Sequence, residues 1–212
     1  MSAAYEAEVL RQWGGANREG QPDGAHDLGH LRRVWATCQR LAAEEPADLQ
    51  VLEAAAFFHD LVNLPKSSPD RARASTLSAK AACTFLATTD FPKLKLDAVA
   101  HAIAAHSFSA GIPTLTTEAK ILQDADRLEA LGAIGLARMF HVAGAMGALL
   151  FDAGDPLAQD RALDDRRFSL DHLETKLFTL PVTMQTVAGA RLAKERADWM
   201  RAYRDRLLTE IA

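Results

Sequence analysis

The sequence has little of what a disulfide scaffold or a thiolate metal site requires. Its 212 residues include only two cysteines, Cys38 and Cys83, which are far apart and form no CxxC spacing. We therefore expect both to be reduced and buried, as in a cytosolic protein. Blocks of like charge do not stand out either, and the formal net charge is −4. This balance argues against nonspecific binding to nucleic acid or to an anionic membrane.

An uninterrupted apolar run is also missing. Residues 128–151 come closest, but Glu129, Arg138 and His141 interrupt them, so they fall short of a membrane span. The first six residues do not have the charged and then apolar pattern of a secretory signal. We therefore expect a cytoplasmic protein, a monomer or homodimer, whose partners include neither nucleic acid nor a membrane.

The sequence has no convincing strand pattern, internal repeat or low-complexity tract. Instead, apolar residues recur at three- and four-residue spacing between prolines and glycines, which is typical of helices. We expect helices over residues 5–13, 26–44, 48–58, 69–87, 93–107, 117–150 and 169–178, and beyond Pro181 to the C-terminus. Ser169 can cap the short helix, and polar residues 152–168 are typical of a long surface loop or lid. The sequence predicts an all-α, single-domain protein.

A histidine and a carboxylate stand side by side where one expected helix ends. His59 and Asp60 follow the apolar segment from Leu52 to Phe58, and Pro65 stops the helix just beyond them. A charge at the edge of a core is rarely found unless it is paired or bound to a cation. The pair therefore predicts a metal-binding or ion-paired position.

Two more side chains of metal-binding type lie on other expected helices. His30 belongs to the helix over 26–44, and Asp126 lies within 117–150. With His59 and Asp60 they make a mixed nitrogen and oxygen set that suits a divalent first-row ion or Mg²⁺. Four protein ligands leave positions for water and substrate on an octahedral ion. Such an ion polarises a phosphoryl oxygen and lowers the pKa of bound water, as hydrolysis at neutral pH requires.

These four positions match the H…HD…D signature of the HD-domain metal-dependent phosphohydrolase superfamily. The surroundings are also similar: His26-Asp27-x-x-His30-x-x-Arg33-Val34 around the first histidine, and Asp124-Ala125-Asp126-Arg127-Leu128 around the last aspartate. Residues 20–150 resemble the small stand-alone bacterial members, and in particular nucleoside triphosphate pyrophosphohydrolases. There is no Gly-Tyr-Pro companion motif, which argues against the cyclic-di-GMP phosphodiesterase branch.

The resemblance implies one helical domain over residues 1–212, with its metal-site core at 20–150 and a lid loop and helices at 151–212. One divalent ion would be bound by His30, His59, Asp60 and Asp126. The ligand set does not decide between Mn²⁺, Mg²⁺, Co²⁺, Ni²⁺, Fe²⁺ and Zn²⁺. The implied activity is hydrolysis of a phosphate ester or phosphoanhydride in a small phosphorylated metabolite, with a nucleotide favoured.

Cations and histidines near the HD pair are candidates for substrate contact. His59, Asp60 and Lys66 are the expected catalytic residues, because Lys66 follows Asp60 closely enough to meet phosphate oxygens. Guanidinium groups bind phosphate well, although charge clusters are often only a solvated helix face. The further candidates for substrate contact are Arg71, Arg73, His26, His101 and His106. For His106, a second role is to orient the nucleophilic water.

Two other functions remain open from the sequence. A non-enzymatic nucleotide sensor of the same fold would be expected to have lost a ligand, and none of the four is missing. A di-iron oxygenase of the same superfamily needs two more histidine ligands. His101 and His106 are available, but their five-residue separation does not obviously fit that role.

Overall fold

The structure is a computed structural model that describes residues 2–14, 27–62, 64 and 70–211. Over these residues the chain is all-α, as predicted, and the β contact recorded within them is an isolated bridge between Leu149 and Phe168. The chain divides into two compact units, residues 1–126 and 127–212. This division does not test whether the chain unfolds cooperatively, so the single domain stays a prediction.

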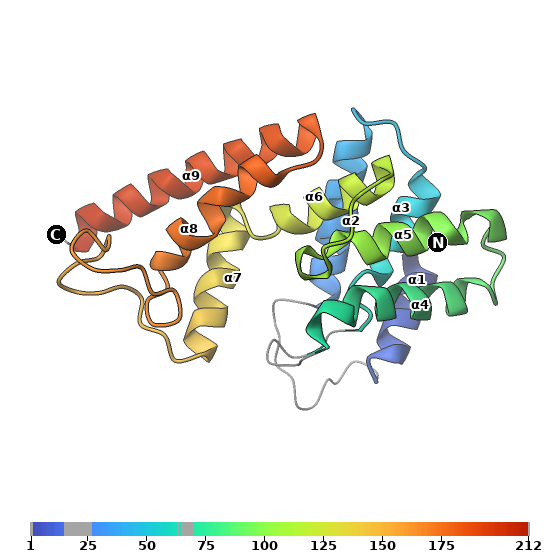
Figure 1. The fold of residues 1–212 in the computed structure, drawn as a ribbon, viewed down its shortest axis with the longest axis horizontal. Coiled ribbons are helices and arrows are strands. Elements are labelled where there is room, and N and C mark those ends of the chain that lie inside the picture. The colour runs from blue at the N-terminus through green and yellow to red at the C-terminus, as the bar shows by residue number, and fades with distance from the viewer. Residues whose placement is uncertain (1, 15–26, 63, 65–69, 212) are drawn as a thin grey trace. The chain divides into compact units, whose positions relative to one another are not determined.

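The first unit contains most of the helices (Figure 1). They are α1 (Ser2–Gln12), α2 (Leu28–Ala42), α3 (Leu49–Phe58), α4 (Ala74–Leu86), α5 (Leu96–His106) and most of α6 (Thr117–Leu128). Short 3₁₀ turns precede or follow some of them: η1 (Arg71–Arg73), η2 (Lys93–Lys95) and η3 (Phe108–Ala110). The second unit contains the end of α6, then α7 (Gly132–Ala145), α8 (Asp171–Thr175), η4 (Leu177–Thr183) and α9 (Val187–Ile211).

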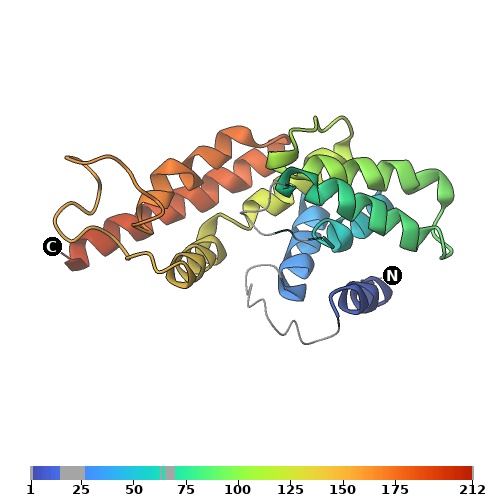
Figure 2. The ribbon, with the colours of Figure 1, turned by 60° about the horizontal axis from the view of Figure 1, so that its bottom comes forward.

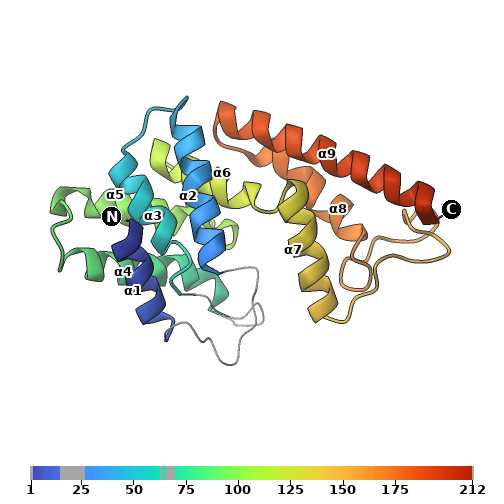
Figure 3. The ribbon, with the colours of Figure 1, turned by 180° about the vertical axis from the view of Figure 1, so that it is seen from behind.

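Helix α3 is the core of the first unit. Every residue from Val51 to Phe58 is buried, as the nearly continuous apolar sequence predicts for a helix enclosed on all sides. Helices α1, α2 and α5 pack against it (Figure 3). Helix α4 lies beside α5, which is visible in both Figure 1 and Figure 2. His59 and Asp60 therefore follow directly after the most buried helix of the unit.

Aromatic rings attach α1 to this core. The Tyr5 ring lies 5.1 Å from Phe58 and 6.2 Å from Phe57, and Phe58 meets Phe85 edge-on at 5.6 Å. Burial, assisted by the Glu53 charge, raises the pKa of the Tyr5 hydroxyl to about 12. Helix α1 thus packs against α3, the helix that leads into His59 and Asp60.

The helix predicted over residues 117–150 is wrong. The single helix expected over residues 117–150 is two helices, because α6 ends at Leu128 and α7 begins at Gly132. The amides of Ala130 and Leu131 donate to carbonyls three residues earlier, which tightens the chain into a turn. Gly132 has φ +77°, a left-handed conformation that glycine adopts at little cost. The apolar pattern continues through this turn and so concealed it.

The loop before α8 is held by a buried carboxylate rather than by a serine cap. Ser169 donates its hydroxyl hydrogen to the Leu149 carbonyl and makes no cap hydrogen bond to α8, so the predicted serine cap is wrong. Asp171 accepts hydrogen bonds from the Arg161 guanidinium at 2.6 and 2.9 Å and from the Asp164 amide at 2.7 Å. The lid function of residues 152–168 stays a prediction.

Helix α9 packs against α7 and η4 within the second unit. In the ranges that the structure describes, no helix combines the length and apolar character that crossing a bilayer requires.

Asp48 caps the N-terminus of α3, as predicted. Its Oδ1 accepts hydrogen bonds from the amides of Gln50 and Val51, and Lys95 Nζ lies 2.6 Å from its Oδ2. Burial raises the pKa of this carboxyl, but the Lys95 and amide hydrogen bonds outweigh burial, so the pKa is lowered overall. The ionised cap therefore stabilises the folded state above the pKa of the unfolded chain.

We predict that Asp48→Ala lowers the free energy of unfolding at pH 7 by about 1–2 kcal/mol. The difference from the wild type should shrink as the pH falls below about 4, because the carboxyl becomes protonated in both states. Urea unfolding at several pH values measures this, with Asp90→Ala, an exposed aspartate of the same unit, as the control. A loss of stability at pH 7 no larger than the control's would contradict the capping role.

Candidate metal centre

His30 lies in the first turn of α2, where the local sequence fixes its position. The Asp27 carboxylate caps the helix by accepting a hydrogen bond from the His30 amide at 2.8 Å. Val34 and Cys38 follow at four-residue intervals on the same buried face. The imidazole is fully buried, so its ring is directed into the unit and away from solvent.

His59 occupies the C-terminal cap of α3, and its ring is oriented by the helix itself. The Nδ1 hydrogen is donated to the Ala56 carbonyl at 2.9 Å, one of the last carbonyls of α3. A neutral imidazole carries one hydrogen, so Nε2 is left with a free lone pair. The same hydrogen bond thus caps the helix and leaves Nε2 as an acceptor that faces the site.

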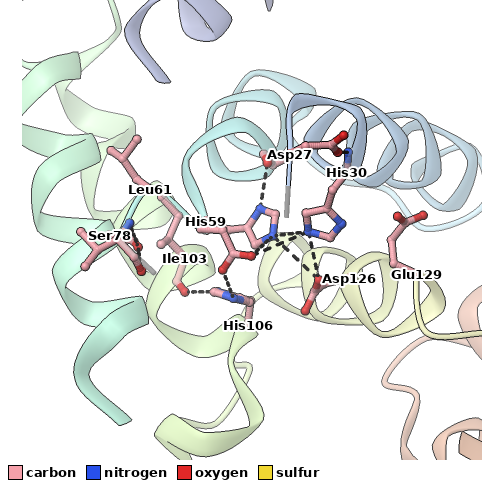
Figure 4. A network of polar contacts seen from close by, with 12 residues as sticks. Asp27, His30, His59, Leu61, Ser78, Ile103, His106, Asp126 and Glu129 are labelled. Atoms are coloured by element: carbon pink, nitrogen blue, oxygen red, sulfur yellow. Dashed lines mark hydrogen bonds and ion pairs between the residues drawn. The ribbon is translucent and has the colours of Figure 1, made fainter. Parts of the chain in front are cut away.

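The two imidazoles and two carboxylates converge within the first unit (Figure 4). The Nε2 atoms of His30 and His59 are 3.2 Å apart. Asp60 Oδ2 lies 3.8 Å from the first and 3.6 Å from the second. Asp126 Oδ1, from α6, lies 3.5 Å and 3.8 Å from the same two atoms. The structure therefore brings together the four side chains that the sequence predicts as one set.

The chemistry of this set fits a cation. Ionised carboxylates and the His59 Nε2 are acceptors only, so atoms this close repel one another unless something positive lies between them. Without a cation, one hydrogen on His30 Nε2 can lie between the imidazoles. A divalent ion would compensate the repulsion, because each of these atoms is of a type that binds metals. His30, His59 and Asp60 offer ligand atoms that all lie within 4.8 Å of one another.

Asp126 has its carboxyl held in the ionised form. Burial raises the pKa of this group, but the imidazoles of His59 and His30 act in the opposite direction and lower it overall. The carboxylate is therefore deprotonated at neutral pH, which is the form that binds metals.

His106 completes the cluster at the end of α5. Like His59, it caps its own helix, because Nδ1 donates to the Ile103 carbonyl at 2.6 Å. Its Nε2 lies 3.8 Å from Asp60 Oδ1, and its ring meets that of His59 edge-on at 4.9 Å. Burial, followed by the nearby His59, lowers the pKa of His106 despite the two carboxylates. At neutral pH this ring is uncharged and presents a lone pair to the site.

The other predicted substrate contacts have different surroundings. Arg71 donates to the Leu64 carbonyl, and Arg73 pairs with Asp70, just before η1, at 3.1 Å. His101 accepts a hydrogen bond at Nε2 from the Leu115 amide at 3.0 Å, which anchors the loop before α6. His26 and Lys66 lie outside the described residues. A role of these five residues in substrate binding stays a prediction.

Several residues that support the site had no sequence signal of their own. Trp13 donates from Nε1 to the Leu61 carbonyl at 3.2 Å, just after the HD pair. Gln123, on α6, donates to the Ala105 carbonyl at 2.9 Å, just before His106. Ser75 and Ser78, on α4, also bond to backbone next to the cluster. For Gln123, Ser75 and Ser78, the pattern that marks them is a polar residue on an otherwise apolar helix face.

An all-α fold with two buried imidazoles and two carboxylates around one point defines a class of helical proteins with a divalent-metal site. The model of the HD domain family matches residues 27–131. An uncharacterized protein of Bacillus subtilis, YpgQ, is 32% identical over 215 residues, which is 100% of this chain and 96% of YpgQ. The chain belongs to the HD-domain family, as its H…HD…D signature predicts.

Solved structures of relatives share the fold over the whole chain. The crystal structure of B. subtilis YpgQ in complex with ADP has a TM-score of 0.75 at 31% identity, covering 100% of this chain and 98% of that one. An HD-superfamily hydrolase from Bacillus thuringiensis has a TM-score of 0.74 at 29% identity, covering 99% and 95%. HD domains bind divalent metals, in agreement with the acceptor cluster described above.

We predict that in the metal-free protein at pH 7.5 both His59 and His106 carry a hydrogen on Nδ1. The reason is that each Nδ1 donates to a carbonyl of its own helix end. Long-range ¹H–¹⁵N correlation spectra distinguish the two ring nitrogens, with assignment by single substitution of each histidine. A spectrum that shows hydrogen on Nε2 of His59 would contradict the arrangement of acceptors.

Proposed function

We propose that this chain is a metal-dependent phosphohydrolase that cleaves a phosphate ester or phosphoanhydride of a nucleotide or another small phosphorylated metabolite. The convergence of two imidazole Nε2 atoms and two carboxylates, at 3.2–3.8 Å, carries this proposal. Membership of the HD-domain family supports it, since one relative is described as an HD-superfamily hydrolase.

In this proposal His30, His59, Asp60 and Asp126 hold one divalent ion. When bound, the ion supplies positive charge opposite phosphoryl oxygens and makes water acidic enough to react at neutral pH. Imidazoles favour ions such as Zn²⁺, Fe²⁺ and Ni²⁺, whereas carboxylates favour Mg²⁺ and Mn²⁺. The mixed set is therefore a reason to test several ions rather than one.

His106 is the residue that we assign to the attacking water. It is uncharged at neutral pH and has a free acceptor at Nε2, 3.8 Å from Asp60 Oδ1. A water beside Asp60 can donate to this nitrogen and pass its proton to it as the oxygen attacks phosphorus. Because Nδ1 is committed to the Ile103 carbonyl, the ring cannot turn its other nitrogen toward the water. We assign His106 the role of general base.

A nucleotide is the substrate class that we favour. The YpgQ relative, similar over its whole length, has been crystallised with ADP. The finer form of the proposal is a (deoxy)nucleoside triphosphate pyrophosphohydrolase, as the sequence resemblance implies. Lys66, Arg71, Arg73 and His26 remain the candidate phosphate contacts, because all four lie in the segments that adjoin the ligands in sequence.

The two alternative functions are supported less well. A di-iron oxygenase needs further histidine ligands, and His101 already uses Nε2 to accept from the Leu115 amide. A nucleotide sensor without activity remains compatible with the fold, although all four ligand positions of the family signature are retained. An activity panel separates these from the phosphohydrolase.

We expect the purified protein to release phosphate or pyrophosphate from at least one member of a panel of nucleotides and p-nitrophenyl phosphates. The panel is assayed with Mn²⁺, Mg²⁺, Co²⁺ and Ni²⁺. Asp126→Ala and His30→Ala should each lower turnover by more than about 100-fold, since outer-shell partners of metals alone contribute about 10- to 100-fold.

The control is His141→Ala, an exposed histidine of α7, which should keep wild-type turnover. Near-normal turnover of Asp126→Ala at saturating Mn²⁺ would rule out the proposed metal centre. Nucleotide binding that shifts the melting temperature without any hydrolysis would favour the sensor.

We predict that His106→Gln lowers kcat by about 10²- to 10⁴-fold, because a general base is worth that much. Its affinity for Mn²⁺ should stay near that of the wild type. His101→Gln, five residues earlier on α5, is the matched variant, and it should keep kcat if its role is only to anchor Leu115. Equal losses in kcat from both variants would show that the change acts on α5 as a whole and would argue against the base.

A further inference from the structure

Helix α4, all of whose residues the structure describes, contributes none of the clustered side chains. It nevertheless contacts backbone on both sides of the cluster. We propose that α4 is the positioning helix of the site, with Ser78 fixing the turn that carries Asp60 and Ser75 fixing the end of α5 that carries His106. This inference rests on the proposed function for its catalytic consequence, although not for its effect on metal binding.

Ser78 forms two hydrogen bonds with the backbone two residues beyond Asp60. Its hydroxyl oxygen accepts from the Val62 amide at 3.0 Å and lies 3.4 Å from the Val62 carbonyl, to which it donates. Ser78 is fully buried, so water does not replace these bonds easily. Figure 4 shows Ser78 and Leu61 beside the histidine cluster. Helix α3 has ended at Phe58 and no longer fixes the backbone here. The Ser78 hydrogen bonds and the Trp13 hydrogen bond to Leu61 therefore define the path of the turn.

Ser75 acts in the same way on α5. The last carbonyls of a helix lack partners within it. In α5 the Ile103 carbonyl accepts from the His106 ring, Ala104 accepts from Ser75 Oγ at 3.0 Å, and Ala105 accepts from Gln123 at 2.9 Å. Two of the three donors come from other helices. The backbone under His106 is therefore tied to α4 and α6.

The direction of these hydroxyls distinguishes them from ordinary helical serines. Serine and threonine in helices commonly donate to the carbonyl four residues earlier. Thr84, on the same helix, does this with Lys80 at 2.9 Å. Ser75 and Ser78, one turn apart on the buried face, instead bond across to other segments. Through these two serine side chains, α4 sets the separation of 3.8 Å between Asp60 Oδ1 and His106 Nε2.

The experiment is a set of double-mutant cycles with Mn²⁺ binding as the first readout, measured by isothermal titration calorimetry. Ser78→Ala should weaken Mn²⁺ binding about tenfold, as loss of an outer-shell partner does. In the Asp60→Asn background the same substitution should have little further effect, because residues that act through one another are not additive. Ser78→Thr retains the hydroxyl and should restore at least part of the affinity.

Ser75→Ala should leave Mn²⁺ affinity nearly unchanged and lower kcat with little change in KM, using the best nucleotide of the panel. This loss in kcat should disappear in the His106→Gln background. Thr84→Ala, whose hydroxyl bonds within its own helix, is the matched control for both readouts.

Additive losses of Mn²⁺ affinity in Ser78→Ala and Asp60→Asn would overturn the proposal, as would wild-type affinity in Ser78→Ala. Wild-type protein that binds Mn²⁺ but hydrolyses nothing in the panel contradicts the proposed function alone. The Ser78 cycle then still decides the positioning role. Wild-type protein that binds none of Mn²⁺, Mg²⁺, Co²⁺, Ni²⁺, Fe²⁺ and Zn²⁺ overturns both the metal centre and the role of α4 in it.

Discussion

The gathering of two imidazoles and two carboxylates at one point is the constraint around which the helices of the first compact unit are arranged. The Nε2 atoms of His30 and His59 each lie within 3.8 Å of oxygens from Asp60 and Asp126. Such a cluster is costly in a buried position unless a cation or a shared hydrogen compensates it. The surrounding helices have to hold these atoms together in advance, so that binding an ion does not require the site to be assembled first.

The chain meets this constraint with hydrogen bonds at the ends of two helices, α3 and α5. His59 and His106 both donate Nδ1 hydrogens to carbonyls at the end of their own helices, which directs both Nε2 lone pairs inward. The helix ends would otherwise leave unsatisfied carbonyls, and the imidazoles would otherwise be free to flip. One hydrogen bond thus serves stability and site geometry together. Asp60 Oδ2 lies nearest the imidazoles of His30 and His59, and its Oδ1 lies 3.8 Å from His106 Nε2.

Features that depend on local pattern could be predicted from the sequence. Helix periodicity, the Asp48 cap and the order of His30, His59, Asp60 and Asp126 all follow from residues close in sequence or from the family signature. Features that depend on long-range contacts could not. Nothing near Ser78 indicates that its hydroxyl bonds to Val62, and the apolar pattern across Gly132 hides a left-handed turn. The resemblance likewise indicated the class of reaction without fixing the substrate.

A crystal structure of the protein soaked with Mn²⁺, with anomalous diffraction data, tests the central claim most directly. We predict one strong anomalous peak in contact with His30 Nε2, His59 Nε2, Asp60 and Asp126, with further positions filled by water. The same soak of Asp126→Ala should show the peak weakened or lost. A peak elsewhere, or none at a Mn²⁺ concentration that supports turnover, would contradict the account.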